Sequence, residues 1–339
     1  MRTIEWKNGV VITPDQLKLP HEFILLELKN CNEVAEAIKS MKIRGAPLIG
    51  AAAAYGLALT AYYSKAKSRE DLLHELDTSA NTLKETRPTA INLFWAIDRV
   101  LNRARASILD VQATVKAVIL EAQRIADEDV EMNYKIGRFG AELLEGGDVI
   151  LTHCNAGALA TVDYGTALGV IRAAWSQGKK IKVFATETRP KLQGARLTTY
   201  ELKRDGIPVT LVTDNMVGFL MYKRMVTKVI VGADRIVRDA VINKIGTYGV
   251  AALAYEHGIP FYVAAPSSTF DLTHTASEVV IEERPSEEVT SFSSLRIAPI
   301  GIEAFNPAFD ITPFKYVSAI ICEKGIFSPA DLEKLLSTT

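Results

Sequence analysis

The chain has 339 residues, of which 48% are hydrophobic and 23% are charged, a composition typical of a soluble globular protein with room for two domains. The formal net charge of −1 provides no basic field that would attract nucleic acid. No apolar run reaches the roughly 18 residues of a membrane span, and the first seven residues lack the apolar core of a signal peptide. We therefore expect a cytoplasmic protein with no membrane or nucleic-acid partner.

The three cysteines are Cys31, Cys154 and Cys322, which lie far apart in the sequence. They form no C-x-x-C pair and show no ligand spacing typical of zinc. This pattern predicts reduced thiols and no metal site. The sequence leaves open whether two of them pair as a disulfide.

The first part of the chain predicts short strands followed by helices. Apolar runs at 10–12 and 23–26 indicate the strands, and Asn32 is placed to cap a helix that ends at Met41. Pro88 disfavours helix at Arg87 and so separates two helical segments. Apolar periodicity predicts further helices at 51–61, 70–85, 92–106 and from 111 to 126. The last of these is expected to be a long helix that joins the two domains.

After about residue 125 the pattern changes to an alternation of strands and helices. Short apolar runs predict strands at 149–151, 181–185, 209–213, 228–232 and 260–264. Repeated β-α-β units predict a parallel sheet with right-handed crossovers. We expect a mainly helical domain with a small sheet at 1–125 and a Rossmann-like α/β domain at 126–339.

Polar residues follow four of the predicted strands, at Cys154/Asn155, Thr186–Arg189, Asp214/Asn215 and Asp234/Arg235. In a doubly wound sheet these strand ends share one edge, where open α/β sheets bind ligands. Cys154 lies at a strand-to-helix turn that can gather an anion, but a cysteine there can also be a small buried apolar residue. Asp234 follows an apolar strand that would desolvate its carboxylate, and its alternative role is a helix cap or an ion pair.

Several other residues have the character of anion-binding groups. Asn243 and Lys244 precede a glycine-containing turn before a helix, a pattern suited to phosphate. Arg44 stands beside the flexible Gly45, and Arg87 and Gln193 also adjoin chain breaks. Taken alone, each of these residue types is more often found at the surface. His153 precedes Cys154, and because adjacent strand residues point to opposite faces, a Cys–His nucleophilic pair is disfavoured.

Six motifs together resemble a known family, the 5-methylthioribose-1-phosphate isomerases, over nearly the whole chain. They are Arg-Gly-Ala-Pro at 44–47, Arg-Pro-Thr-Ala-Ile-Asn-Leu at 87–93, Thr-His-Cys-Asn-Ala-Gly-Ala-Leu-Ala-Thr at 152–161, Glu-Thr-Arg-Pro-Lys-Leu-Gln-Gly at 187–194, Val-Gly-Ala-Asp-Arg-Ile at 231–236 and Asn-Lys-Ile-Gly-Thr-Tyr at 243–248. That family shares its fold with regulatory subunits of translation initiation factor 2B and with archaeal ribose-1,5-bisphosphate isomerase. One departure is Arg238-Asp239-Ala240-Val241, where the family pattern is richer in glycine and asparagine.

The resemblance implies an aldose–ketose isomerase of methionine salvage that forms 5-methylthioribulose 1-phosphate without a metal or organic cofactor. It assigns Cys154 and Asp234 to catalysis. It assigns substrate binding to Arg44, Gly45, Ala46, Arg87, Gln193, Asn243 and Lys244. It also implies a homodimer with the active site in a cleft between the domains. The alternatives are a ribose-1,5-bisphosphate isomerase and a non-catalytic initiation factor 2B-like subunit.

Overall fold

The computed structural model describes residues 2–87, 89–106, 110–292 and 295–332, so Pro88 lies outside the described residues. The chain forms two compact units. Unit 1 comprises Met1–Tyr134 and Gly157–Gly165, and unit 2 comprises Lys135–Ala156 and Thr166–Thr339. The division falls inside one long helix, and a short segment between two elements of unit 2 folds with unit 1.

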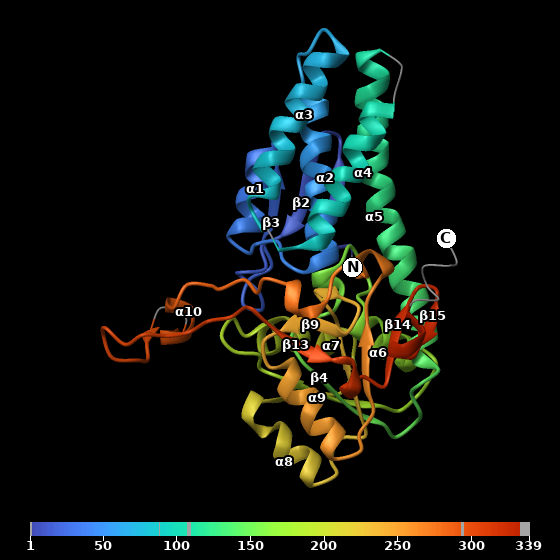
Figure 1. Ribbon diagram of the computed structural model, residues 1–339, viewed down its shortest axis with the longest axis vertical. Helices are drawn as coiled ribbons and strands as arrows, with labels where there is room; N and C mark the ends of the chain where they lie inside the picture. Colours follow the sequence, from blue (N-terminus) through green and yellow to red (C-terminus); the bar gives the residue numbers. More distant parts are fainter. Residues whose placement is uncertain (1, 88, 107–109, 293–294, 333–339) are drawn as a thin grey trace. The chain divides into compact units, whose positions relative to one another are not determined.

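Unit 1 begins with an antiparallel sheet of three strands, β1 (Glu5–Lys7), β2 (Val10–Pro14) and β3 (Leu25–Leu28), in the order β1-β2-β3. The helices that follow are α1 (Cys31–Lys39), α2 (Ala46–Tyr63), α3 (Arg69–Lys84), α4 (Ile91–Ala106) and α5 (Val111–Ala141). In unit 1 the long helices lie side by side (Figure 1). The expected helical region with a small sheet is confirmed.

The first helix begins earlier than its predicted cap. Asn30, not Asn32, is the N-cap residue, and its side chain accepts a hydrogen bond from the backbone N–H of Glu33. Asn32 therefore lies within the first turn of α1, and the prediction for Asn32 was wrong. Two asparagines flank Cys31, and only the extended backbone of Asn30, with φ −151°, leaves its side chain free to cap the helix.

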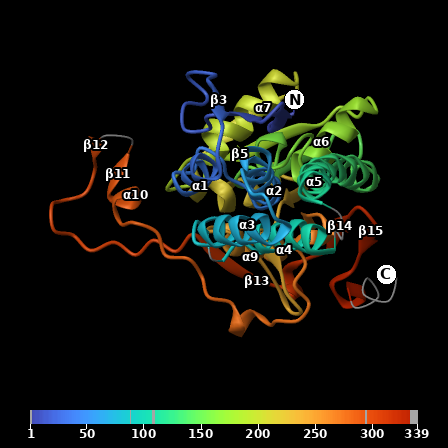
Figure 2. The ribbon, with the colours of Figure 1, turned by 90° about the horizontal axis from the view of Figure 1, so that it is seen from above.

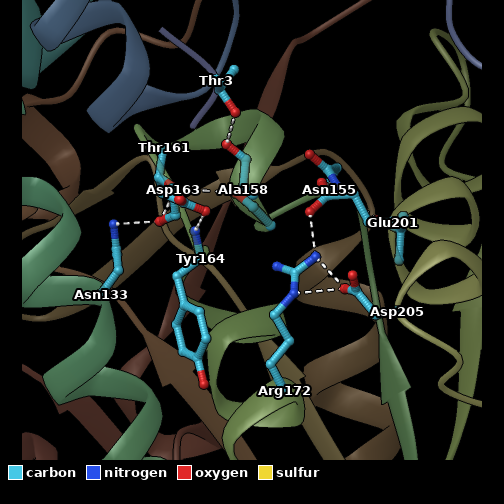
Figure 3. Close-up of polar contacts among 12 residues, drawn as sticks. Thr3, Asn133, Asn155, Ala158, Thr161, Asp163, Tyr164, Arg172, Glu201 and Asp205 are labelled. Carbon is cyan, nitrogen blue, oxygen red and sulfur yellow. Dashed lines mark hydrogen bonds and ion pairs between the residues drawn. The ribbon is translucent and has the colours of Figure 1, made fainter. Parts of the chain in front are cut away.

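The segment 157–165 is attached to unit 1 by buried hydrogen bonds (Figure 3). Thr3 donates its N–H to the carbonyl of Val162 at 2.7 Å and its hydroxyl to the carbonyl of Ala158 at 2.6 Å. From α5, Asp129 accepts the N–H of Val162 at 2.7 Å, and Asn133 donates to the carbonyl of Asp163 at 3.3 Å. These bonds satisfy the backbone of a segment that has little regular structure of its own.

Unit 2 is built on a seven-stranded sheet with the order β15-β14-β10-β7-β4-β5-β6. Every neighbouring pair is parallel except β14 and β15. The strands are β4 (Val149–Thr152), β5 (Lys182–Thr186), β6 (Val209–Val212), β7 (Lys228–Val231), β10 (Phe261–Ala264), β14 (Ala319–Cys322) and β15 (Gly325–Phe327). The order of the six parallel strands is that of a doubly wound dinucleotide-binding sheet, 3-2-1-4-5-6, so the Rossmann-like prediction is confirmed.

Both faces of this sheet are buried. The helices of this unit are α6 (Ala167–Ser176), α7 (Thr199–Arg204), α8 (Val217–Tyr222), α9 (Thr247–Glu256) and α10 (Glu287–Thr290). Ile150 belongs to an apolar cluster that includes residues of α5, α6 and α7, whereas Leu151 belongs to a cluster with residues of α8 and α9. Adjacent strand residues point to opposite faces, which explains the continuous apolar runs in the sequence.

Elements that the sequence analysis did not predict complete unit 2. A second sheet has the order β13-β9-β8 and consists of β8 (Arg235–Ile236), β9 (Ala240–Lys244) and β13 (Phe309–Pro313). The turn of its β8–β9 hairpin contains Arg238 and Asp239, the point of departure from the family pattern. Figure 2 shows that α10 and the hairpin of β11 (Ser291–Phe292) and β12 (Leu295–Arg296) lie on an arm that runs out from the rest of unit 2.

In the described ranges, no helix combines the length and the apolar character needed to cross a membrane. None of the three cysteines, all of which lie in the described ranges, is in a disulfide, and Cys154 is half-buried while Cys31 and Cys322 are buried. The question of a disulfide, which the sequence left open, is thereby answered for this structure.

The protonation state of Asp129, which binds segment 157–165 through the N–H of Val162, makes the stability of the fold depend on pH. Burial raises the pKa of Asp129 to about 7, against the opposing effect of the hydrogen bonds from Val162 and Asn133. Because the folded-state pKa lies above the unfolded value, protonation stabilises the fold fully at low pH, and this contribution is lost as pH rises toward 7. In the wild type, the free energy of unfolding should therefore fall by on the order of 2–4 kcal/mol between pH 4 and 7, and Asp129→Asn should abolish this fall.

Thermal denaturation from pH 4.5 to 8 measures this effect as a difference between variant and wild type. Glu131→Gln, which changes an exposed carboxylate on the same helix, serves as the matched control and should keep the wild-type slope. An Asp129→Asn protein whose melting temperature follows the wild-type pH dependence would contradict this assignment.

Candidate functional site

Cys154 lies where β4 ends, at the point where the strand order of the unit 2 sheet reverses. The neighbours of β4 are β5 on one side and β7 on the other, and all three strands are parallel. The chain leaves β4 toward one face of the sheet and leaves β7 toward the other, and open α/β sheets bind ligands at such a reversal. Cys154 follows β4 and Asp234 follows β7, so the two predicted catalytic residues lie at the ends of adjacent strands.

The backbone of Cys154 adopts a left-handed conformation with φ +64°. Non-glycine residues rarely adopt this conformation, which costs roughly 1–2 kcal/mol. Two threonines hold it in place. The N–H of Cys154 donates to Oγ1 of Thr188 at 2.9 Å, and the hydroxyl of Thr198 donates to the carbonyl of Cys154 at 2.6 Å.

Thr188 is itself held by the turn that follows β5. Its φ is +65°, an outlier for a β-branched residue. The carboxylate of Asp214 accepts the N–H groups of Thr188 and Arg189, each at 2.7 Å. The polar residues that the sequence analysis noted after β5 and β6 therefore meet, and their hydrogen bonds support the Cys154 turn.

Asn155 connects the same turn to a buried ion pair (Figure 3). Its Nδ2 donates to Glu201 Oε1 at 2.9 Å and to Thr198 Oγ1 at 3.2 Å. Arg172 from α6 pairs with Glu201 at 2.8 Å and with Asp205 at 2.6 Å. Burial alone would lower the pKa of Arg172, but the two carboxylates raise it above its usual value.

The sequence analysis missed Thr198, Glu201 and Arg172. Arg172 carried a usable signal, because it is a single charge within the otherwise apolar helix Ala167–Ser176. A buried charge of this kind requires a partner. The sequence did not say which carboxylate that would be.

The imidazole of His153 forms its hydrogen bonds with groups other than the Cys154 thiol. Its Nδ1 lies 2.7 Å from Thr186 Oγ1, and its Nε2 lies 2.8 Å from the carbonyl of Ile245. The ring is buried, and burial lowers the pKa of His153 despite its hydrogen bond to Ile245. Both ring nitrogens have partners other than the thiol, as expected from the opposite orientation of adjacent strand residues.

Asp234 follows the carboxyl end of β7. Its N–H donates to the carbonyl of Ile242 at 3.0 Å, which joins it to β9. Two residues earlier, a Cβ added to Gly232 would come within 2.6 Å of the Cβ of Ala156. Only glycine allows the end of β7 to approach the segment that follows Cys154 so closely.

Asn243 and Lys244 lie on β9, just before α9. Asn243 donates to the hydroxyl of Thr247 at 3.0 Å. Lys244 donates to the carbonyl of Ala308 at 2.6 Å, and its Nζ lies 4.6 Å from the ring centroid of Phe309. Both side chains are buried, so neither is an ordinary surface residue.

The first N–H groups of α9 are bound by a carboxylate of the chain itself. Gly246 donates to Asp310 at 2.7 Å and Tyr248 donates to it at 3.1 Å. Burial raises the pKa of Asp310 to about 6, which the two N–H donors and Lys244 oppose. The turn predicted to suit an anion therefore does hold one, in the form of this side chain.

Gln193 is buried at the start of the π-helix Gly194–Thr198. Its Oε1 has no hydrogen-bond partner among the described residues. Unsatisfied buried acceptors are rare in proteins and mark a position where a donor is expected to bind. The neighbouring Gly194 packs so tightly on β5 that an added Cβ would lie 1.8 Å from the carbonyl oxygen of Thr186.

The remaining predicted residues, Arg44, Gly45, Ala46 and Arg87, belong to unit 1. Nε of Arg44 donates to Oε1 of Gln16 at 3.0 Å, and Gln16 in turn donates to the carbonyl of Leu159 at 2.7 Å. Gly45 caps α2 with φ +100°, and an added Cβ would lie 2.5 Å from the carbonyl oxygen of Ala160. Arg87, like Arg44, is buried, and arginine side chains are mostly exposed in proteins.

Comparisons with known proteins identify the family. The model of the initiation factor 2 subunit family matches residues 42–329. The chain belongs to the initiation factor 2 subunit family. It is 54% identical to a methylthioribose-1-phosphate isomerase of Acetivibrio thermocellus over 97% of both chains. The resemblance to these isomerases stated from the motifs is confirmed.

Solved structures of the family have the same fold. The 5-methylthioribose 1-phosphate isomerase of Pyrococcus horikoshii matches with a TM-score of 0.93 and 46% identity, over 100% of this chain and 96% of that one. A structure from A. fulgidus, described as subunit delta of translation initiation factor eIF-2B, matches with a TM-score of 0.88 and 53% identity over 99% of both chains. Within the described ranges, no group of three or more His, Cys, Asp or Glu side chains is placed to hold a metal ion.

The close packing of Gly194 yields a stability prediction. Gly194→Ala forces a methyl group against the backbone of β5, which cannot move without disrupting the sheet, and should destabilise the protein by about 3 kcal/mol or more. Urea denaturation measures the loss. Gly249→Ala in α9, where an added Cβ meets nothing within 4 Å, should be neutral or slightly stabilising. Equal midpoints for the two variants would contradict the packing argument.

Proposed function

We propose that Cys154 and Asp234 form the catalytic pair of an isomerase acting at the carboxyl ends of β4 and β7. The reaction of the family's isomerases, and of this chain, converts 5-methylthioribose 1-phosphate into 5-methylthioribulose 1-phosphate in methionine salvage. The observation that carries the assignment of the pair is the reversal of strand order between β4 and β7. Each of the two residues follows one of these strands.

The substrate sets a specific chemical requirement. Its anomeric oxygen carries the phosphate, so the sugar ring cannot open to a free aldehyde before the reaction. Ring opening needs an acid, and the aldose–ketose conversion moves a hydrogen from C2 to C1. Two protonatable groups at different positions around the ring meet both needs.

In this proposal Asp234 exchanges a proton with the ring oxygen or a hydroxyl, and Cys154 acts as the acid and base near C1 and C2. A hydride shift from C2 to C1 is the alternative, and it leaves Cys154 an orienting or electrostatic role. Substrate deuterated at C2 separates the two routes. Proton transfer through Cys154 loses deuterium to the solvent, whereas a hydride shift retains it in the product.

The residues that we propose for substrate binding are those that the family resemblance assigned. Arg44 and Arg87 from unit 1 supply guanidinium groups for the phosphate, beside the backbone of Gly45 and Ala46. Asn243, Lys244 and Gln193 come from unit 2. The buried Oε1 of Gln193, which has no partner among the described residues, is suited to accept a hydrogen bond from a sugar hydroxyl.

Replacing either member of the catalytic pair should impair turnover more than binding. Cys154→Ser and Asp234→Asn should each lower kcat at least about 100-fold, the usual contribution of general acid–base catalysis. Both changes are nearly isosteric and leave the proposed phosphate contacts in place, so KM should change far less. The double variant should be little worse than the poorer single variant, because the two residues act together.

A coupled assay with 5-methylthioribose 1-phosphate measures these constants, and ribose 1,5-bisphosphate tested in parallel examines the alternative substrate. Cys31→Ser, at a buried cysteine of unit 1, is the matched control and should keep the wild-type kcat. Wild-type turnover by Cys154→Ser would make Cys154 a structural residue. Full activity of Asp234→Asn would show that the carboxylate of Asp234 has a structural role, such as a helix cap, and no catalytic one.

We also propose that the protein is a cytoplasmic homodimer. Closed two-fold dimers are the commonest oligomers. Unit 2 offers a candidate interface, because Leu295 of β12 and the following Ile300 and Phe305 are 68%, 92% and 76% exposed. Light scattering across micromolar concentrations should give twice the mass of the chain, and a monomer mass throughout that range would refute the dimer.

A further inference from the structure

We propose that His153 is a positioning residue for the reaction, which fixes Cys154 by joining the turn after β4 to the turn before α9. The inference rests on the proposed function in one respect, namely that Cys154 is catalytic. The residues that carry the link are His153, Thr186, Thr188 and Ile245. None of them is assigned a role by the motifs that the family resemblance supplied.

The hydrogen bonds of His153 determine its tautomer. The carbonyl of Ile245 can only accept, so the proton of the neutral ring is on Nε2, 2.8 Å away. Nδ1 is then an acceptor, and the hydroxyl of Thr186 donates to it at 2.7 Å. A neutral ring agrees with its burial, since His153 is 2% exposed.

The chain of hydrogen bonds continues from Thr186 to Cys154. Oγ1 of Thr186 and Oγ1 of Thr188 are 3.3 Å apart, so the Thr188 hydroxyl can donate to Thr186, either to this oxygen or to the carbonyl at 3.3 Å. In either case Oγ1 of Thr188 keeps a lone pair for the N–H of Cys154, at 2.9 Å. The imidazole thus orients the hydroxyls of Thr186 and Thr188, and the second of these accepts the N–H of Cys154, whose backbone is left-handed.

The imidazole also fills the space beneath the turn before α9. A Cβ added to Gly246 would lie 2.9 Å from both Cε1 and Nε2 of His153, so the ring and the turn are in direct contact. Gly246 has φ +103°, which favours glycine in any case. The charged groups that act on the ring are Asp214 after β6 and Lys244 on β9, and Asp310 on β13 holds the N–H of Gly246.

This geometry gives His153 a mechanical role. Both of its ring nitrogens are engaged within the protein, so it does not serve as the acid or base of the reaction. Its two hydrogen bonds fix the Cys154 turn relative to the strand that carries Asn243 and Lys244. A shift of about 1 Å between a reacting group and bound substrate can cost roughly 100-fold in rate, which is why such a support affects turnover.

Two substitutions at 153 separate positioning from bulk packing. Gln can donate to Ile245 and accept from Thr186, whereas Leu can do neither. We expect His153→Leu to lower kcat by roughly 10- to 100-fold with KM changed by less than about threefold. His153→Gln should restore kcat to within about fivefold of wild type.

The second readout is the alkylation of Cys154 by iodoacetamide, followed by peptide mass spectrometry, which needs no substrate. Cys154 is half-buried, while Cys31 and Cys322 are buried and report unfolding. Loosening the turn should make Cys154 react at least about threefold faster in His153→Leu than in His153→Gln. Cys31 and Cys322 should be alkylated slowly in both variants.

Thr188 provides the same test if His153→Leu does not fold. Thr188→Val removes the acceptor of the Cys154 N–H at constant volume, and Thr188→Ser keeps it. Only the valine variant should show low kcat and fast alkylation of Cys154. A folded His153→Leu or Thr188→Val protein with wild-type kcat and wild-type alkylation would overturn the proposal.

The two readouts distinguish failure of this inference from failure of the proposed function. Faster alkylation of Cys154 with unchanged kcat would support the positioning of Cys154 by His153 and refute its catalytic role. A wild-type protein that isomerises no sugar phosphate would refute the proposed function, and the alkylation rates would still decide whether His153 positions Cys154.

Discussion

The reversal of strand order between β4 and β7 is the constraint on which the candidate site depends. A parallel sheet with the order 3-2-1-4-5-6 has one place where consecutive connections leave in opposite directions. The chain after β4 and the chain after β7 flank that place, and Gly232 lets them approach because a side chain there would collide with Ala156. Polar groups from distant parts of the sequence can meet there without burying the reacting atoms completely.

Support for Cys154 comes from hydrogen bonds to backbone groups rather than from apolar packing. Its N–H and carbonyl are bonded to Thr188 and Thr198, and Asn155 next to it reaches the buried Glu201. A buried ion pair of this kind contributes little net stability, because the desolvation of both charges offsets their attraction. Losing one partner would nevertheless be costly, so the network favours one conformation of the turn over others.

The chain that carries Cys154 continues into a segment of the other unit. After Ala156 it enters Gly157–Gly165, which folds with unit 1 and is bonded there by Thr3, Asp129 and Asn133. The same segment lies against Gly45, where a Cβ would meet Ala160, and its Leu159 accepts a hydrogen bond from Gln16, the partner of Arg44. Within unit 1 the residues around Arg44 are thus packed against chain that directly follows the candidate catalytic turn.

The sequence by itself determined the fold class and the strands that end in polar residues, because apolar periodicity and strand-end chemistry are local properties. It did not reveal the sheet β13-β9-β8, in which β13 pairs with the sequence-distant β9, or the excursion at 157–165. It also placed a cap at Asn32 where backbone conformation selects Asn30. Only the tertiary structure could decide which partners hold Cys154, His153 and Arg172, because hydrogen bonds between residues 29 or more positions apart depend on how the chain folds and not on the residues alone.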